Sequence, residues 1–442
     1  MINCFIPFLS LPQARQTVRA LGLCDRIKNI YLLATEKIPD EVEGCEMLMI
    51  DSPASTATFR TIALHADTAY TLLYTKYTAF EPGQFAFERL LAIAGDTNAG
   101  MLYADRYLLK NGNSQQAPVI DYQKGSLRDD FDFGSLLFFR SSVLKQAVRA
   151  MDADYRFAGL YDLRLRVSEL AELVHVNEYL YSEVETDIRK SGEKLFDYVD
   201  PKNRAVQIEL EAVCTAYLKR VGGYLAPDFE PVTFDAGGFE QEASVIIPVR
   251  NRIRTIEDAI RSVLAQKTTF RFNLIIVDNH STDGTSEAIG KYTADGRVVH
   301  LVPERSDLGI GGCWNVGVHH PACGKFAVQL DSDDVYSGPD TLQKIVDAFY
   351  EQNCAMVVGT YRMTDFKMNE IPPGIIDHRE WTLENGRNNA LRINGLGAPR
   401  AFYTPVLRRI NLPNTSYGED YALGLRISPR SEERRVGKEC RS

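Results

Sequence analysis

The chain has 442 residues, of which 45% are apolar and 25% are charged, the composition of an ordinary globular protein of two or three domains. Its 50 basic and 59 acidic residues give a formal net charge of −9, which argues against a partner bound through nucleic-acid phosphates. Eight scattered cysteines and the lack of a long apolar run argue against a zinc site, a disulfide framework and a transmembrane segment. We therefore expect a cytoplasmic protein, which could still reach the inner face of a membrane through a partner or a lipid-linked acceptor.

The first half of the sequence alternates between strand and helix patterns. Residues 2–9 form an apolar run, which we interpret as a strand and not as a signal peptide, because a basic start and a cleavage site are missing. Helical spacing of apolar residues follows, and then two strand patterns at 28–35 and 47–51. The stretch 69–83 leads into a helix pattern at 85–95 and then into a further strand pattern. This order predicts an α/β fold.

Two segments separate the halves of the chain. Residues 190–225 have a helical pattern after Pro201, and a pair of glycines at 222–223 ends it. Residues 226–242 are rich in proline, glycine and acidic residues, as is typical of a domain linker. We therefore interpret residues 191–242 as a helical segment and linker.

The second half has ligand-type residues at the ends of its predicted strands. Strand patterns at 243–249 and 273–278 are each followed by polar residues, and a glycine-rich turn at 307–318 precedes a third strand at 326–330. Three aspartates follow that strand: Asp331, Asp333 and Asp334. Carboxyl ends of parallel strands meet at one edge of a sheet, so we expect these side chains in one crevice. Two carboxylates spaced in this way can bind a hard cation that bridges to a phosphate, although a solvated acidic turn is the simpler interpretation of such a pair alone.

Five motifs of the second half together resemble those of family 2 glycosyltransferases, which have the GT-A fold. In chain order they are VIIPVRN, LIIVDNHSTDGT, DLGIGGCWNVG, VQLDSDDV and YGEDYALGLR. Asn279 departs from the family pattern, where a second aspartate is common, and Asp307 stands where asparagine is common. The resemblance implies a GT-A domain over residues 243–429. It also implies transfer of a sugar from a nucleotide-diphosphate donor, in the first place a UDP-sugar, to a glycan or lipid-linked acceptor in polysaccharide biosynthesis.

The resemblance also implies roles for individual residues. Asp333, with Asp331, would bind a divalent cation, Mn²⁺ or Mg²⁺, which stabilises the charge that develops on the leaving diphosphate. Asp420 would take the proton of the acceptor beside Glu419, in a single displacement that inverts the anomeric carbon. The residues implied around the nucleotide sugar are Pro248, Arg250, Asn251, Asp278, Asn279, Gly309, Gly312, Trp314, Asn315, Asp331 and Ser332. The glycines of the turn, Gly311 included, would let backbone approach the nucleotide, whereas core packing is an equal alternative for Trp314.

The first half repeats the second in a weaker form. The stretch 69–83 aligns with 326–340 without a gap, and this alignment places Lys76 on Asp333. Further along, Tyr161 stands in place of Glu419. We therefore predict two tandem GT-A domains of the Rossmann-like, nucleotide-diphospho-sugar transferase type, joined by the helical linker. The first, over residues 1–190, would be degenerate and would not catalyse metal-dependent transfer.

The last residues, 430–442, resemble the translated read-through of a sequencing adapter. We expect them to be artefactual or disordered, with a genuine basic tail as the alternative, and we expect the natural protein to be longer.

Two other functions fit parts of the sequence. A nucleotidyltransferase uses a similar sheet and a cation, but the stretch VRNRIRTIED after the first strand of the second half lacks the glycines of a phosphate loop. A nucleotide-sugar-binding pseudoenzyme or scaffold fits the first half better than the second.

Overall fold

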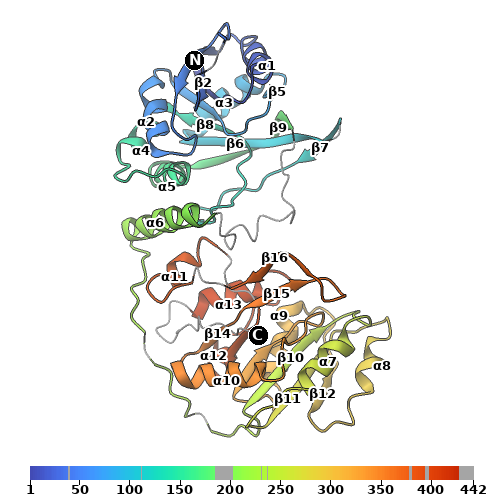
Figure 1. The fold of residues 1–442 in the computed structure, drawn as a ribbon. Coiled ribbons are helices and arrows are strands. Elements are labelled where there is room, and N and C mark those ends of the chain that lie inside the picture. The colour runs from blue at the N-terminus through green and yellow to red at the C-terminus, as the bar shows by residue number, and fades with distance from the viewer. Residues whose placement is uncertain are drawn as a thin grey trace. The chain divides into compact units, whose positions relative to one another are not determined.

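The computed structural model describes residues 1–37, 40–110, 112–184, 203–229, 231–235, 237–377, 381–393 and 398–427. The chain divides into two compact units (Figure 1). The first unit contains residues 1–194 and 202–223, and the second contains residues 195–201 and 224–442. The predicted tail at 430–442 lies outside the described residues.

A mixed sheet of nine strands forms the centre of the first unit, in the order β3-β2-β1-β4-β8-β6-β9-β5, with β7 paired to β6. β3, β2, β1 and β4 are parallel, and β8 runs antiparallel to both β4 and β6. The strands are β1 (Ile2–Pro7), β2 (Ile27–Ala34), β3 (Glu46–Met49), β4 (Tyr70–Tyr74), β5 (Glu81–Pro82), β6 (Met101–Lys110), β7 (Asn113–Ala117), β8 (Leu136–Arg140) and β9 (Leu173–Val184).

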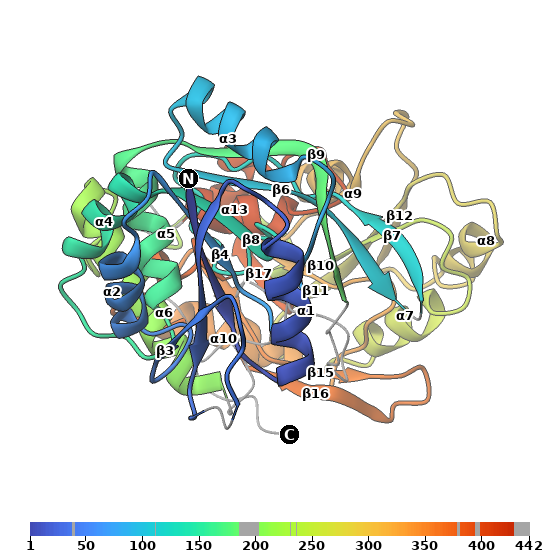
Figure 2. The same ribbon diagram turned by 90° about the horizontal axis from the view of Figure 1, so that it is seen from above.

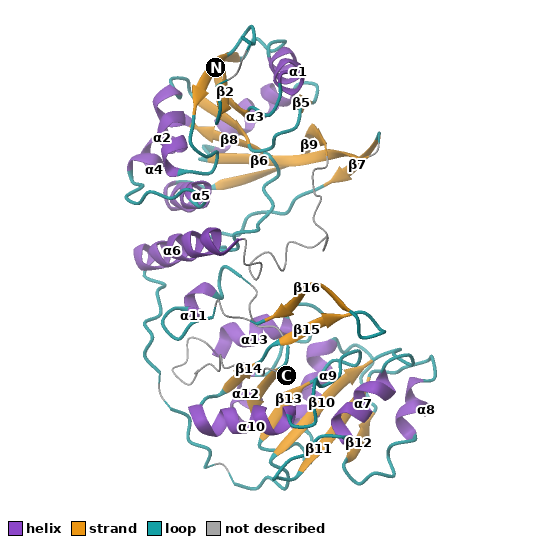
Figure 3. Ribbon diagram, viewed as in Figure 1, coloured by secondary structure: helices purple, strands orange, loops and turns teal. Residues whose placement is uncertain are grey.

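Helices cover both faces of this sheet (Figure 3). The helices are α1 (Leu11–Leu21), α2 (Thr56–His65), α3 (Ala86–Thr97), α4 (Ser141–Arg149), α5 (Gly159–Leu170) and α6 (Arg204–Val221). Side chains alternate between the faces along β1: Cys4 and Ile6 pack with α1 and α3, whereas Phe5 packs with α2, α4 and α5. Burial on both faces explains why the first strand is apolar at nearly every position.

The helix that was predicted after Pro201 is α6, and it belongs to the first unit. It ends at Gly222, whose φ of 74° suits a residue without a side chain. The Glu209 carboxylate accepts hydrogen bonds from three backbone N–H groups at residues 156–158, and Arg220 pairs with Glu169 of α5 at 2.7 Å. The helix therefore packs against its own unit, and the change of unit comes after residue 223.

The second unit contains a six-stranded sheet in the order β12-β11-β10-β13-β17-β14 and a separate two-stranded hairpin, β15–β16 (Figure 2). The strands are β10 (Ala243–Val249), β11 (Phe272–Asp278), β12 (Val298–Leu301), β13 (Phe326–Gln329), β14 (Met356–Val358), β15 (Tyr361–Thr364), β16 (Glu370–Ile376) and β17 (Arg400–Tyr403). The helices are α7 (Ile256–Leu264), α8 (Thr285–Gly290), α9 (Ile310–His319), α10 (Thr341–Gln352), α11 (Gly386–Asn389), α12 (Thr404–Ile410) and α13 (Glu419–Ile427). The α/β class predicted from the sequence is confirmed.

The two sheets have the same strand order over six strands. β3-β2-β1-β4-β8-β6 of the first unit corresponds to β12-β11-β10-β13-β17-β14 of the second, and the fifth strand is antiparallel to its neighbours in both. The internal repeat predicted from the sequence is therefore visible in the topology. That the first unit is a degenerate GT-A domain stays a prediction.

The strand pairing corrects the register of this repeat. Superposing the prolines that close β1 and β10 places Ile2 on Ala243, and these residues pair with Tyr70 and Phe326 respectively. Tyr70 therefore corresponds to Phe326, and the next pairing in each sheet, to β8 and β17, agrees with this assignment.

The correction moves Lys76 away from the cation position. Counting along the strands from these pairs, Thr75 corresponds to Asp331 and Tyr77 corresponds to Asp333. The expectation that Lys76 stands on Asp333 is wrong by one residue, because Lys76 falls on Ser332. The acidic pair is missing from the first unit in either register.

Candidate active site

The turns after β10 and β11 are tied to one another at the carboxyl edge of the sheet. Asn251 adopts a left-handed backbone with φ of 55°, and its backbone N–H donates to Ser281 Oγ at 3.0 Å. Its side-chain Oδ1 accepts from the backbone N–H of Thr282 at 2.8 Å. Because the two turns share these bonds, they form one rigid edge beside the residues that follow β13.

Asp278 stabilises this edge from inside. The residue is buried, its Oδ1 accepts from the backbone N–H of Ser281 at 3.0 Å, and its Oδ2 accepts from the Ser286 hydroxyl. Burial opposes ionisation, but these hydrogen bonds outweigh it, so the pKa of Asp278 lies below its ordinary value. Asp278 was predicted to contact the nucleotide, but its carboxylate is already occupied by its own turn. Its neighbour Asn279 is also buried and donates to the Leu308 carbonyl at 2.9 Å.

The other candidates at this edge differ in exposure. Pro248 is buried within β10, and Ser332 is buried between the two exposed or half-buried aspartates of the D-x-D motif. Arg250 is exposed. Of the predicted nucleotide-binding residues in the first two motifs, Arg250 and Asn251 are therefore the ones whose side chains reach solvent.

The D-x-D and E-D motifs come together around an arginine that the sequence analysis missed. Arg400 begins β17, and the pairing of β13 with β17 places it directly opposite Gln329. Its Nε donates to Gln329 Oε1 at 2.7 Å, and one of its terminal nitrogens forms an ion pair with Asp420 at the start of α13. Gln329 ends β13, two residues before Asp331.

The acidic residues of the two motifs also shift one another's pKa. Burial raises the pKa of Asp331, with Asp333 and Asp420 adding to the shift and Arg400 opposing it. The pKa of Asp334 rises to about 6, first because its surroundings displace water and then because Asp331 and Asp333 lie nearby, although part of its side chain remains exposed. Burial also raises the pKa of Glu419, again with Asp420 adding and Arg400 opposing.

The carboxylates of the D-x-D motif fit a hard divalent cation that takes most of its ligands from a bound substrate and from water. Asp331, Asp333 and Asp334 offer carboxylate oxygens, which such a cation prefers. Within the described ranges, no trio of His, Cys, Asp or Glu ligand atoms within 4.8 Å of one another includes any of them. A cation held by one or two carboxylates, with a diphosphate and water supplying the other ligands, matches this arrangement.

A second arginine lies at the exposed side of the cluster. Arg252 Nε is 3.7 Å from Asp333 Oδ2, and both side chains are about half exposed at 51% and 46%. An exposed pair of this length contributes little to stability and yields easily to a competing cation. Both arginines carried a sequence signal, since Arg252 follows the first motif directly and Arg400 is a charged residue at the start of an otherwise apolar run.

The glycine-rich turn packs closely against a later segment of the same chain. A Cβ on Gly309, Gly311 or Gly312 would collide with residues 413–415. Asn315, in α9, donates to the Leu412 carbonyl at 2.8 Å and accepts from the Leu412 N–H at 3.0 Å. The glycines therefore allow close approach of the segment that leads to Glu419 and Asp420, and contact of their backbone with a nucleotide stays a prediction.

The predicted pocket role of Trp314 is corrected. Its exposed fraction is 2%, and it belongs to the hydrophobic core of the second unit. Of the two alternatives, core packing holds, because a side chain with so little exposed surface cannot line a pocket.

Replacing Gly311 by alanine is expected to lower the free energy of unfolding of the second unit by about 1–3 kcal/mol and to slow sugar transfer. The added methyl would overlap the Pro413 carbonyl oxygen and would lie 3.1 Å from Glu419 Cβ, so the 413–415 segment must shift and carry α13 with it. Urea unfolding and transfer assays measure both effects. Gly290→Ala is the matched control, because nothing lies within 4 Å of the new methyl at the end of α8; an equal effect in both variants would contradict the expected shift of this segment.

The corresponding position of the first unit is closed by internal ion pairs. Lys76 Nζ donates to Glu183 Oε1 at 2.7 Å, and Arg106 Nε donates to the same oxygen at 2.9 Å. The Ser135 hydroxyl donates to the other carboxylate oxygen, and the Glu183 side chain has no exposed surface. The backbone N–H of Thr75 donates to the Ser135 carbonyl at 2.8 Å, so this cluster lies where β4 ends.

The base position of the first unit is closed as well. Asp162 of α5, which matches Asp420 in the sequence, is 1% exposed and accepts from Arg166 Nε at 2.9 Å. Arg220 of α6 lies 3.9 Å from the same carboxylate. Burial raises the pKa of Asp162, and the two arginines oppose the shift.

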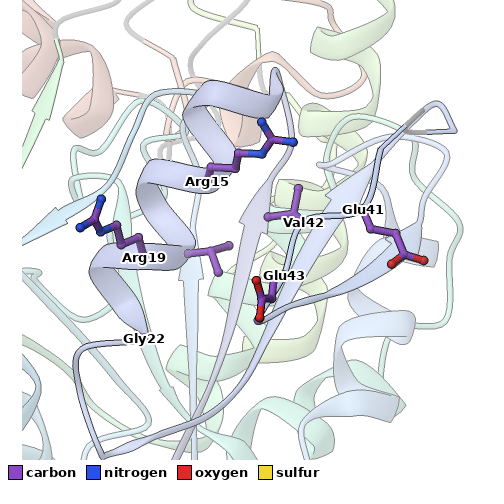
Figure 4. A pocket seen from close by; sticks show the side chains of 8 residues that line it. Arg15, Arg19, Gly22, Glu41, Val42 and Glu43 are labelled. Carbon is purple, nitrogen blue, oxygen red and sulfur yellow. The ribbon is translucent and has the colours of Figure 1, made fainter.

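The first unit also has a pocket of about 480 Å³ between α1 and residues 41–44 (Figure 4). Arg15 and Arg19 of α1 and Glu41 and Glu43 of the loop line it. Its two positive and two negative side chains balance, and no predicted site residue lines it. Among the described residues, no helix is long and apolar enough to span a bilayer.

The second unit matches a known family. The sequence model of Glycosyl transferase family 2 matches residues 244–409. An uncharacterized glycosyltransferase of Rickettsia felis is 30% identical over 203 residues, which are 45% of this chain and 32% of that protein. The putative teichuronic acid biosynthesis glycosyltransferase TuaG of Bacillus subtilis is 33% identical over 120 residues, which are 27% of this chain and 46% of that protein. The chain thus spans less than half the length of either relative.

Among solved structures, the chain is similar to S. aureus TarS 1–349, with a TM-score of 0.37 and 22% identity, over 45% of this chain and 58% of that one. The family match covers four of the five motifs, up to and including the strand that carries Arg400, and the relatives agree with it. The model of Glycosyl transferase family 2 thus matches most of the second unit of this chain.

Proposed function

We propose that the second unit transfers a sugar from a nucleotide-diphosphate donor, in the first place a UDP-sugar, to a hydroxyl of a glycan or lipid-linked acceptor. The observation that carries this proposal is the meeting of the D-x-D and E-D motifs around Arg400. A site of this kind holds a cation for the donor diphosphate and a carboxylate for the acceptor proton within one crevice. Similarity to the putative teichuronic acid biosynthesis glycosyltransferase of Bacillus subtilis supports a role in polysaccharide biosynthesis.

In the proposed reaction, Asp333 and Asp331, which follow β13, would hold Mn²⁺ or Mg²⁺. The cation, when bound, offsets the negative charge that develops on the departing nucleoside diphosphate. Asp420 accepts the proton of the acceptor hydroxyl as that oxygen attacks the anomeric carbon, and single displacement inverts the configuration there. Arg250 and Asn251, which reach solvent at the same edge, are the candidates for contacts to the nucleotide.

We also propose that the first unit does not catalyse metal-dependent transfer. Its counterpart of the D-x-D motif lacks carboxylates, and Lys76 is engaged with Glu183. Its retained aspartate, Asp162, is engaged with Arg166 and is inaccessible. These contacts favour a packing or scaffolding role for this unit, which was the alternative considered for the first half of the sequence.

Calorimetric titration of the full chain tests the donor site. A UDP-sugar is expected to bind with Mn²⁺ present and to bind at least about tenfold more weakly with EDTA or in Asp333→Asn, since either change removes a charge-assisted contact to the diphosphate. Asp340→Asn is the matched control, because Asp340 is an exposed aspartate of the same connection and pairs with Lys344 at 3.0 Å. Metal-independent binding of equal affinity in all variants would overturn the proposal.

A further inference from the structure

Arg400 is a buried cation at the centre of an acidic cluster. Its side chain is 10% exposed, whereas that of Arg252, at the rim, is 51% exposed. A buried guanidinium is costly unless carboxylates and hydrogen-bond acceptors surround it. Arg400 meets this condition through Gln329 and Asp420, and its charge also opposes the pKa shifts of Asp331, Asp334 and Glu419.

The two acidic motifs differ in how their oxygens are occupied. Asp420 Oδ1 accepts from the backbone N–H of Tyr421 at 2.6 Å, and Oδ2 is paired with Arg400. No hydrogen bond from a described side chain reaches the carboxylate of Asp331 or Asp334, and Asp333 has the long contact to Arg252 alone. The D-x-D carboxylates are thus open to a cation, whereas Asp420 is held by the protein.

This difference matters because Arg400 contacts both Asp420 and Gln329, and Gln329 precedes Asp331 by two residues, so the two acidic motifs share one cluster. A divalent cation bound at the D-x-D motif attracts every carboxylate within reach, and a carboxylate that ligates a metal is a much weaker base. Some feature of the site must therefore keep the base apart from the cation. Arg400 is suited to this task, because the cross-strand contact to Gln329 fixes the guanidinium on the Asp420 side of the cluster.

We propose that Arg400 is a positioning residue that reserves Asp420 for the acceptor by holding its carboxylate out of the coordination shell of the cation. The inference rests on the proposed function and divides the acidic residues into two groups. Asp331 and Asp333 bind the cation, whereas Asp420, which Arg400 holds in place, accepts the proton of the acceptor. Without Arg400, Asp420 becomes an additional metal ligand.

The test is a double-mutant cycle in which Mn²⁺ binding to the full chain is measured. Binding is measured by calorimetry and by the electron paramagnetic resonance signal of free Mn²⁺, each with and without UDP. In the wild-type chain, Asp420→Asn is expected to change the Mn²⁺ dissociation constant by less than about threefold. In the Arg400→Gln background, the same substitution is expected to weaken Mn²⁺ binding by about tenfold, because Asp420 has become a ligand there. If the residues acted only through their net charge, Asp420→Asn would have equal effects in both backgrounds, and the proposal would be overturned.

Two controls make the result specific. Arg252→Gln removes an arginine from the rim, and in its background Asp420→Asn is expected to have the small wild-type effect. Arg400→Lys keeps the charge but loses the planar guanidinium that contacts both Gln329 and Asp420, so the Asp420→Asn effect is expected to lie between its values in the wild-type and Arg400→Gln chains. If circular dichroism shows Arg400→Gln to be unfolded, the Arg400→Lys chain takes its place in the cycle. An effect of Asp420→Asn on Mn²⁺ binding that is larger in the Arg400→Lys chain than in the wild-type chain supports the proposal, and an equal effect overturns it.

Transfer kinetics give a second measurement. Arg400→Gln is expected to lower kcat without raising the KM for the donor, since the acceptor step and not donor binding is affected. A wild-type chain that binds no Mn²⁺ even with UDP would contradict the proposed function itself. A wild-type chain that binds Mn²⁺ with equal Asp420→Asn effects in both backgrounds would overturn the role of Arg400 and leave the proposed function intact.

Discussion

Replacing Asp420 by asparagine is expected to slow sugar transfer by a factor of about 10²–10⁴, the usual contribution of a positioned general base. An alcohol is a poor nucleophile at neutral pH, and asparagine matches aspartate in size but cannot accept the proton. The backbone N–H of Tyr421 can still donate to the asparagine oxygen, so the start of α13 should remain in place. Donor binding in the presence of Mn²⁺ should therefore change little, and the loss should appear in kcat.

The control for this prediction is Asp258→Asn. Asp258 is likewise an aspartate in the first turn of a helix that follows the sheet edge, and it pairs with an arginine, Arg261, at 2.7 Å. Its side chain is exposed, and the pair is worth little. Product formation by the two variants is compared at saturating donor; a loss of less than about threefold in Asp420→Asn would remove Asp420 from the proposed mechanism.

The fold was largely predictable because its signals are local. Apolar runs such as 243–249 and 273–278 need only their own composition to be identified as buried strands, and both are strands in the structure. The register of the repeat was not local. Matching 69–83 to 326–340 by eye aligned a later proline and put Lys76 one residue too far along, whereas strand pairing with β1 and β10 fixes the register independently.

The candidate site was predictable in its motifs but not in the contacts between them. The glycine-rich turn was expected to approach a nucleotide, because glycines permit close approach by any partner. The partner that the structure shows is the segment 411–415, about a hundred residues later in the chain, and no local pattern indicates which backbone will fill the space. Trp314 was ambiguous for the same reason, since an aromatic residue in a helix suits a core and a pocket equally well.

The sequence contains a signal that could have placed Arg400 in the candidate site. A charged residue at the start of an otherwise apolar strand that is buried requires a buried partner, and the carboxylates of the D-x-D and E-D motifs are candidates for it. The pairing itself could not be predicted, because it depends on β17 lying antiparallel between β13 and β14.

Replacing Glu183 by alanine is expected to destabilise the first unit by about 3–5 kcal/mol, since breaking a buried ion pair leaves its partners without compensation. Glu183 is the shared acceptor of Lys76 Nζ, Arg106 Nε and the Ser135 hydroxyl, and its side chain has no exposed surface. Arg106 is itself only 10% exposed, so its guanidinium would lose its inner partner and keep Asp132 alone, at 2.8 Å. The effect is measured by urea unfolding of the full chain, monitored by probes specific to the first unit.

Glu178→Ala is the matched control on the same strand, β9. Glu178 pairs with Arg89 at 2.6 Å, but both side chains are largely exposed, so the loss should be below about 1 kcal/mol. A large difference between the two variants would mean that the cluster at the end of β4 is a structural element that fills the space a cation and diphosphate would need. Equal, small effects in the two variants would contradict this structural role. A buried carboxylate that contributes little to stability would point to a role in binding. The first unit would then have to be assayed as a second transferase site.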